Sequence, residues 1–249
     1  MTTFRDHFSS SSAGYVRFRP RYPGALFEWI AAGSPARGRV WDCATGTGQA
    51  ATGLARHFDL VVATDASAAQ LAHAEAHPRI RYMRSAAEAS GLRTASVDAI
   101  VAAQALHWFD IPAFFAEAER VARPGALVAV WTYGHPSIDS AIDAVIGPFH
   151  RDVVGPYWPP ERRLIERLYQ DIDVPFAPVA APRIPLRMSM TLEELMGYID
   201  TWSAVQRYRE VTGTDPMPAL ADSLAGVWGS SLERRATEWP LVIKAGRVR

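Results

Sequence analysis

The amino-acid sequence predicts an α/β domain with a mostly parallel sheet that is covered by helices on both faces. Short, continuously apolar runs at residues 60–64, 97–103 and 126–131 are typical of strands buried on both sides. Helical patterns separate these runs along the chain. Apolar strands that alternate with helices are typical of crossover units, which connect parallel strands.

The expected elements follow one another closely through the first half of the chain. A helix over 25–32 ends at Gly33-Ser-Pro, and Ser67 is a suitable cap for a later helix. The other strands and helices are expected at 40–42, 50–58, 60–64, 67–76, 79–83, 97–103, 111–122 and 126–131. This order predicts five strands connected by helices or short loops.

The alternation ends after Gly134, where prolines become frequent. Helices are expected at 160–170, 192–209 and 217–225, and a last strand at 239–249. No internal repeat is present. We therefore expect one domain whose late segments form a cap over one end of the sheet.

Composition excludes several classes of function. Lys+Arg and Asp+Glu both number 26, so the chain lacks the basic surplus of a typical nucleic-acid-binding protein. The single cysteine, Cys43, excludes an internal disulfide and a multi-cysteine zinc site. The first 23 residues contain no apolar core of signal-peptide length, and no run of about 18 apolar residues occurs in the sequence. We expect a cytoplasmic protein that binds no nucleic acid, membrane or metal.

A glycine-rich loop follows the first predicted strand, in Asp42-Cys-Ala-Thr-Gly-Thr-Gly48. Gly46 and Gly48 permit backbone conformations and close approaches that other residues do not. A loop between a strand and a helix N-terminus favours a nucleotide-like ligand. Asp65 ends the next strand, where its carboxylate can accept both hydroxyls of a ribose. The loop is compatible with a dinucleotide or with S-adenosylmethionine, and Asp42 could instead cap the next helix.

The motifs at the strand ends resemble those of class I S-adenosylmethionine-dependent methyltransferases. They are Asp42-x-Ala-x-Gly-x-Gly48, Asp65, Ala87-Glu88, Val97-Asp98-Ala-Ile and Arg123-Pro-Gly125. Ala44 departs from the family's usual glycine. The resemblance implies a Rossmann-like fold with a seven-stranded sheet, its last strand antiparallel, and a helical cap.

Further motifs resemble the trans-aconitate methyltransferase-like group (methyltransferase type 11). They are Tyr15-x-x-x-Arg-Pro-x-Tyr-Pro23, His107-Trp108-Phe109, Thr201-Trp202-Ser203 and Trp239-Pro240-Leu241. With this resemblance, the single domain 1–249 divides into an N-terminal lid, a cofactor-binding core, a cap with the late helices, and a terminal strand. The respective boundaries are 1–23, 24–134, 135–238 and 239–249.

The resemblance implies S-adenosylmethionine as the cofactor and places its contacts in the lid and at the strand ends. Asp65 would hold the ribose, Ala87 and Glu88 would flank the adenine, and Gln104 would line the methionine end. The full set of expected cofactor contacts is Tyr15, Arg19, Asp42, Ala44, Gly46, Gly48, Asp65, Ala87, Glu88, Gln104 and Ala105.

His107 is the candidate catalytic residue because it follows the fourth strand, near the expected position of the methyl group. It could act as a general base for an alcohol or amine, or it could only shape the pocket wall. A carboxylate acceptor needs no base and would be held by an arginine, for which Arg17, Arg19 and Arg207 are candidates.

The cap is rich in aromatic residues, which fill a core or wall an apolar substrate cavity. They are Phe149, Tyr157, Trp158, Tyr169, Phe176, Tyr198, Trp202 and Tyr208. Tyr198 and Trp202 lie four residues apart and are expected on one helix face.

We therefore expect a methyltransferase that acts on a small organic molecule, with a carboxylic acid as one candidate. The alternatives are an apolar lipid- or quinone-like acceptor, an NAD-type oxidoreductase, or a non-catalytic cofactor-binding protein. An oxidoreductase would need a pair such as Tyr-x-x-x-Lys, but the only lysine is Lys244, in the last strand.

Overall fold

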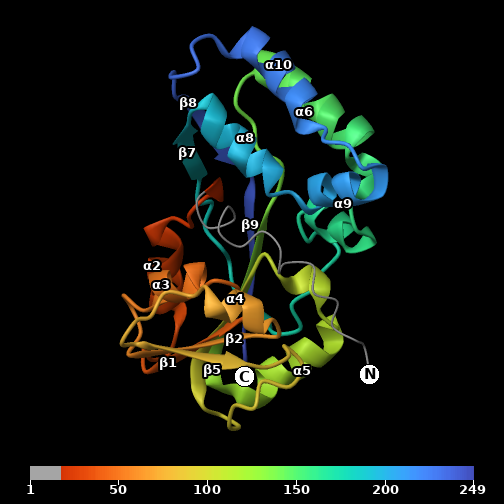
Figure 1. Cartoon of the computed structure of the whole chain (residues 1–249). Helices are drawn as coiled ribbons and strands as arrows, with labels where there is room; N and C mark the ends of the chain where they lie inside the picture. Colours follow the sequence, from red (N-terminus) through yellow and green to blue (C-terminus); the bar gives the residue numbers. More distant parts are fainter. Residues whose placement is uncertain (1–17) are drawn as a thin grey trace.

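A seven-stranded sheet forms the centre of the computed structural model, which describes residues 18–249 (Figure 1). The strand order is β3-β2-β1-β4-β5-β9-β6. The strands are β1 (Arg39–Cys43), β2 (Leu60–Asp65), β3 (Ile80–Arg84), β4 (Val97–Ala103), β5 (Ala122–Tyr133), β6 (Ala177–Pro178) and β9 (Leu241–Arg247). Strands β1 to β5 pair in parallel, and β9 runs antiparallel to β5. The predicted Rossmann-like class I methyltransferase fold is confirmed.

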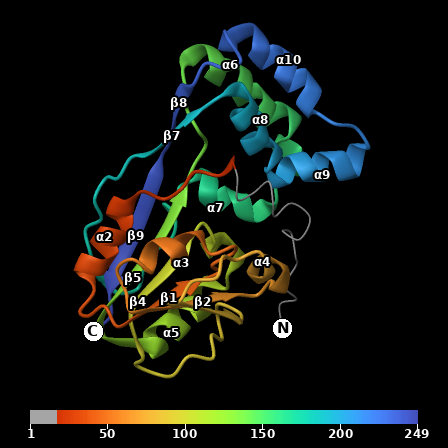
Figure 2. The same cartoon turned by 60° about the vertical axis from the view of Figure 1, so that its left-hand side comes forward.

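Helices cover both faces of this sheet (Figure 2). They are α2 (Gly24–Gly33), α3 (Gln49–Leu54), α4 (Ala68–Ala72) and α5 (Ile111–Val121). Val40 packs in one buried cluster with residues of α2 and α3, whereas its neighbour Trp41 packs in another with residues of α5. Because successive side chains of a strand point to opposite faces, the sheet separates two layers of core.

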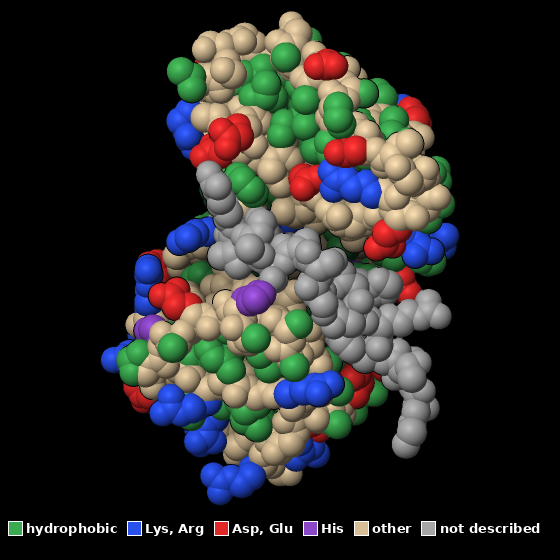
Figure 3. Space-filling view, in the orientation of Figure 1, with side chains coloured by type: hydrophobic (Ala, Val, Ile, Leu, Met, Phe, Trp, Pro, Cys, Tyr) green, Lys and Arg blue, Asp and Glu red, His purple; other side chains and the backbone are tan. Residues whose placement is uncertain are grey.

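A second group of helices packs above the C-terminal ends of the parallel strands. It consists of α6 (Ser140–Pro148), α8 (Leu192–Asp200), α9 (Ser203–Thr212), α10 (Met217–Trp228) and a two-stranded sheet of β7 (Leu186–Met190) and β8 (Arg235–Trp239). We call this group the helical lobe and the seven-stranded sheet with its helices the core lobe. The helical lobe has its own buried cluster, which includes Ile142, Leu195 and Trp228. Figure 3 shows the two lobes above and below a narrower waist.

Short helical turns connect α6 to the core lobe. They are η2 (Phe149–Val153), η3 (Gly155–Tyr157), η4 (Pro160–Arg162) and α7 (Arg163–Glu166). After η4 the chain returns to the core lobe, where Ile165 and Tyr169 pack in the same cluster as α5. The cap expected over 135–238 is therefore interrupted. Tyr169 and Phe176, expected in the cap, pack against the core lobe.

Two predicted elements are each split in the structure. The helix expected over 192–209 is divided into α8 and α9, and Trp202 is the N-cap of the second. Tyr198 and Trp202 therefore lie on different helices, although their rings still meet edge to face at 5.9 Å. The last strand is divided at Pro240 into β8, which pairs with β7, and β9, which pairs with β5.

Other differences concern helix lengths and one missed helix. Ser67 caps α4 as expected, since its hydroxyl accepts the N–H of Gln70, but α3 and α4 are shorter than predicted. Helix α6 was not expected, although Asp139 caps it by accepting the N–H groups of Ala141 and Ile142. Within residues 18–249, no helix is long and apolar enough to cross a membrane.

Candidate functional site

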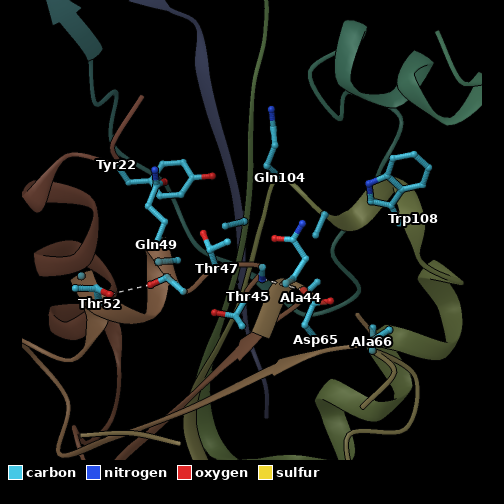
Figure 4. A pocket seen from close by; sticks show the side chains of 18 of the residues that line it. Tyr22, Ala44, Thr45, Thr47, Gln49, Thr52, Asp65, Ala66, Gln104 and Trp108 are labelled. Atoms are coloured by element: carbon cyan, nitrogen blue, oxygen red, sulfur yellow. Dashed lines mark hydrogen bonds between the residues drawn. The ribbon is translucent and has the colours of Figure 1, made fainter. Parts of the chain in front are cut away.

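A cavity of about 1530 Å³ opens at the C-terminal ends of β1, β2 and β4. This edge of a parallel sheet is the usual ligand position. Core-lobe residues form most of its lining, and Arg19, Tyr22 and Glu161 close it from other sides. In Figure 4, Ala44, Thr45 and Asp65 lie at the floor, with Tyr22 and Trp108 on opposite sides. Drug-sized ligands occupy pockets of about 300–1,000 Å³, so this cavity has room for a cofactor and an acceptor together.

The glycine-rich loop forms the floor of the cavity through left-handed backbone. Ala44, Gly46 and Gly48 have φ angles of 53°, 58° and 87°. A side chain at position 48 would collide with the hydroxyl of Tyr82, so only glycine fits there. The Thr52 hydroxyl donates to the carbonyl of Gly48 at 2.9 Å, which holds the loop against the start of α3 (Figure 4). The loop therefore brings its backbone close to a ligand, and its Thr45 and Thr47 line the cavity as well.

Asp65 joins this loop to the start of α4. Its two carboxylate oxygens accept the N–H of Gly46 and the N–H of Ser67, each at 2.8 Å. The carboxylate lines the cavity at the end of β2. Asp65 thus has a structural task in the loop in addition to any contact with a ligand.

Asp42 is fully buried below the loop, with 0% of its surface exposed. The Thr45 hydroxyl donates to its Oδ2 at 2.5 Å, whereas its Oδ1 has no hydrogen-bond partner. Burial, together with the negative charge of Asp65, raises the pKa of Asp42 to about 7. A buried carboxylate oxygen without a donor costs free energy, so this atom fits a site that receives a positively charged or hydrogen-bond-donating group.

Gln104 connects the ends of β4 and β5 through its side chain. Its Oε1 accepts the Thr132 hydroxyl and the Tyr133 N–H, and its Nε2 donates to the Tyr133 carbonyl. Its φ angle of 53° places it in left-handed backbone. Because the amide is already engaged, the part of Gln104 that is suited to meet a ligand is its backbone.

Ala87, Glu88 and Ala105 also line the cavity. The Glu88 carboxylate accepts the N–H of Asp110 at 3.0 Å and so fixes the start of α5. Ala87 and Ala105 are buried. The residues expected to meet the adenine and the methionine end therefore share one wall.

His107 lies in η1 (Leu106–Trp108), on the wall of the cavity, and is 8% exposed. Its Nδ1 is 3.2 Å from the Tyr169 hydroxyl, which also accepts the N–H of Leu106. Burial, with a smaller effect of the positive charge of Arg162, lowers the pKa of His107 to about 3. The imidazole is therefore neutral at physiological pH.

Arg19 bridges the two lobes. Its guanidinium donates to the Thr201 hydroxyl, the Thr201 carbonyl and the Tyr133 hydroxyl, and lies 5.4 Å from the centre of the Tyr198 ring. Gln49 of α3 donates to the carbonyl of Pro20 at 3.0 Å. The described part of the expected lid is therefore held against both lobes.

The remaining expectations concern Tyr15 of the lid and the candidate arginines Arg17 and Arg207. Tyr15 and Arg17 lie outside the described residues. Arg207 is 64% exposed and pairs with Glu210 in α9, and it does not line the cavity. Gln49 and Arg162 were not among the expected site residues. Tyr22 and Trp108 appeared only as parts of motifs.

Comparison with known proteins identifies the family to which the chain belongs. A family model described as a methyltransferase domain matches residues 41–130. A protein of Dictyostelium discoideum named as a methyltransferase is 33% identical over 90% of this chain and 86% of its own length. A protein of Saccharomyces cerevisiae named as an S-adenosylmethionine-dependent methyltransferase is 31% identical over 50% of this chain and 46% of its own.

A solved structure from Anaeromyxobacter dehalogenans, described as a type II methyltransferase, is similar over nearly the whole molecule. It is 44% identical, with a TM-score of 0.87, and the match covers 93% of this chain and 98% of the other. The similarity therefore includes the helical lobe as well as the core lobe. The narrower trans-aconitate methyltransferase-like group stays a prediction.

These matches decide between the two ligands that the glycine-rich loop admits. The cofactor is S-adenosylmethionine rather than a nicotinamide dinucleotide. The left-handed loop, the orphaned Asp42 oxygen and the size of the cavity fit this cofactor. The chain belongs to the class I S-adenosylmethionine-dependent methyltransferases.

Proposed function

We propose that the cavity holds S-adenosylmethionine against the glycine-rich loop and a small organic acceptor beside it, below the helical lobe. The supporting observation is a large cavity that is lined by core-lobe strand ends and also by Arg19, Tyr22 and Glu161. The cofactor supplies a methyl group that its sulfonium charge already activates. The task of the chain is then to align the acceptor and exclude water, and positioning of this kind is worth about 7–11 kcal/mol.

The cofactor contacts are assigned from the geometry of the floor and wall. Asp65 is proposed to accept the ribose hydroxyls, since it lines the cavity at the end of β2, beside the glycine-rich loop. Asp42 Oδ1 makes no hydrogen bond to residues 18–249, which supports a role in balancing the positive methionine end. Ala87 and Glu88 are proposed for the adenine, and the backbone of Gln104 and Ala105 for the methionine end.

The low pKa of His107 bears on the acceptor. A general base works best when its pKa lies near the operating pH, and an imidazole with a pKa of about 3 is far below it. We propose that His107 stays neutral and contacts the acceptor as a hydrogen-bonding wall. A carboxylate acceptor, which is already ionised, suits such a site better than an alcohol.

An apolar lipid- or quinone-like acceptor is the second candidate, and the aromatic lining supports it. Tyr22, Trp108 and Phe109 line the cavity, and aromatic walls favour apolar ligands. Methyl-transfer turnover on matched panels distinguishes the two classes. Transfer to small acids supports the first candidate, transfer to phenols or quinols alone supports the second, and no transfer to any acceptor contradicts both.

Asp65→Ala should weaken the binding of S-adenosylhomocysteine. A lost hydrogen bond to a charged group costs about 1.5–3 kcal/mol, which corresponds to roughly a 10- to 100-fold higher Kd in titration calorimetry. Asp59→Ala is the matched control, because Asp59 is an exposed acid that does not line the cavity. An unchanged Kd in a folded Asp65→Ala protein would contradict the assignment.

A further inference from the structure

A second group of side chains lies next to the cavity and contains buried polar atoms that make no hydrogen bond to residues 18–249. Arg162 ends η4, and its neighbour Glu161 lines the cavity. The Arg162 guanidinium lies 3.7 Å from the centre of the Trp158 ring. Its Nε is buried and makes no hydrogen bond, and within residues 18–249 the side chain forms no ion pair. Arg162 as a whole is half-buried, and a buried polar atom without a partner costs free energy.

The surroundings of Arg162 add positive charge and unsatisfied donors. The positive charge of Arg19 opposes its own, and together with burial it lowers the pKa of Arg162 to about 10. Tyr198, Glu166 and Tyr133 oppose this lowering, and the effect of Tyr198 is larger than that of Arg19. Trp158 Nε1 is also buried without a hydrogen-bond partner. The balance of charge here favours an anion.

Two histidines also belong to this group, and neither balances the positive charge of Arg162. His135 and His150 meet edge to face at 4.6 Å, and both contact the Trp202 ring. Burial lowers the pKa of His150 to about 3 and lowers that of His135. Both rings are therefore neutral, and each has a buried Nε2 without a hydrogen-bond partner. The aromatic faces of Trp158 and Trp202, 5.7 Å apart, enclose this polar group.

We propose that Arg162, stacked on Trp158, recognises a carboxylate of the methyl acceptor. This inference rests on the proposed function and names the substrate class. Arginine donates in a planar fork that matches a carboxylate, and stacking on an indole fixes the plane of that fork. Arg162 does not itself line the cavity, but its neighbour Glu161 does, as do Arg19 and Tyr133, whose charges act on Arg162. Trp158, on which Arg162 stacks, would contact the apolar part of the acid.

The test uses the full chain saturated with S-adenosylhomocysteine and titrated with small carboxylic acids. The panel contains aromatic, branched aliphatic and tricarboxylic acids, each paired with its primary amide, which has a similar shape but no charge. At least one acid should bind more tightly than its amide. Arg162→Gln should weaken that acid by about 10- to 100-fold and leave the amide and S-adenosylhomocysteine unchanged.

Two further variants separate recognition from a structural role. Arg162→Lys keeps the charge but loses the fork, so its effect should be intermediate. Arg162→Met removes a half-buried cation that forms no ion pair with residues 18–249, so its melting temperature should equal or exceed that of the wild type. Arg207→Gln, in which an exposed arginine of the helical lobe is changed, is the control and should bind the acid normally.

The outcomes distinguish this inference from the proposed function. If S-adenosylhomocysteine binds but no acid is preferred to its amide, or if Arg162→Gln binds acids normally, the inference is overturned and the methyltransferase assignment stands. A lower melting temperature of Arg162→Met, with acid and cofactor affinity lost together, would also overturn it in favour of a structural role. Failure of S-adenosylhomocysteine to bind the wild type would overturn both.

Discussion

Ala44 occupies a backbone conformation that suits glycine better. Its φ angle is 53°, and left-handed backbone costs a residue with a Cβ about 1–2 kcal/mol. Ala44 lies in the loop at the floor of the cavity, where local strain is tolerated if the surroundings determine the conformation. The departure from the family's glycine therefore lowers stability without altering the path of the chain.

Ala44→Gly should stabilise the protein. Relief of the left-handed strain exceeds the added flexibility of the unfolded chain, about 0.4–1 kcal/mol, so a net gain of roughly 0.5–1 kcal/mol is expected. Thermal unfolding should show a melting temperature higher by about 1–4 °C. Ala116→Gly, at an exposed position inside α5, should change it in the opposite direction. A decrease for both variants would contradict the strain at Ala44.

Asp42 links cofactor binding to pH. Because its pKa in the folded protein is raised to about 7, the folded state binds a proton more tightly than the unfolded state. The contribution of Asp42 to stability therefore falls as pH rises from about 4 to 7. A positive group of the cofactor beside the carboxylate would reverse this preference and favour the ionised form.

Binding of S-adenosylhomocysteine should accordingly tighten by about tenfold between pH 6 and pH 8, as Asp42 ionises. Calorimetry at the two pH values measures the change. Asp42→Asn should bind more weakly, lose most of this pH dependence and, since it cannot ionise, unfold at a higher temperature than the wild type at pH 8. The same tenfold change in the Asn variant would assign the linkage to another group.

Helix α8 carries Tyr198 and ends next to Thr201, two contacts of Arg19. A reciprocal cap begins this helix: the Thr191 hydroxyl accepts the N–H of Glu194, and the Glu194 carboxylate accepts the N–H of Thr191. The cap defines the first turn of α8 and thereby the position of its far end, where Arg19 is bound.

Thr191→Ala should lower the free energy of unfolding by about 1 kcal/mol, because it leaves an N–H of the first turn without its acceptor. Chemical denaturation is the measurement. Thr191→Ser retains the hydroxyl and should behave like the wild type. If Ala and Ser are equally stable, the cap makes no net contribution.

Helices and strands were predicted correctly where several local signals in the sequence agreed. Strands β2, β4 and β5 were predicted because apolar runs of that length are buried from both faces. The division between α8 and α9 was missed because helical periodicity continues through Thr201 and Trp202, and packing around the Trp202 ring overrides it. Pro240 was a visible signal, since it lacks the N–H that a strand interior needs.

The site residues that local motifs mark were predicted, and those that depend on three-dimensional packing were not. All described cofactor contacts expected from motifs line the cavity, except Asp42, which is buried directly below it. The role proposed for Arg162 could not be predicted from the sequence. It rests on the lack of an ion pair with residues 18–249 in the folded structure, and the spacing of residues along the chain does not reveal this. Arg207 was a reasonable candidate because arginine suits a carboxylate. In the structure it is exposed on α9, pairs with Glu210 and does not line the cavity.

Buried histidines make the stability of the whole molecule sensitive to acid. His107 and His150, with pKa values lowered to about 3, and His135, lowered as well, cannot bind a proton in the folded state where the unfolded chain can. Stability therefore falls as pH decreases from about 6.5 toward 3. Asp42 acts in the opposite direction over part of this range.

His107→Gln should reduce this sensitivity. Between pH 7.5 and pH 5, protonation of the unfolded state at His107 costs the wild type about 2 kcal/mol, which the Gln variant avoids. Melting temperatures measured at both pH values should therefore fall less in the variant. Parallel decreases in the two proteins would show that His107 does not contribute to the acid response.

The path of the chain between the lobes limits which segments can be exchanged with a relative to change acceptor specificity. Tyr133 and Leu241 pair in register, so the segment that builds the helical lobe leaves and rejoins the core lobe at adjacent positions. Adjacent ends normally permit the exchange of a whole insertion. Here, however, residues 163–178 return to supply β6 and the Tyr169 partner of His107. A functional chimaera would exchange 135–162 and 184–239 as two grafts and keep the host's own 163–178.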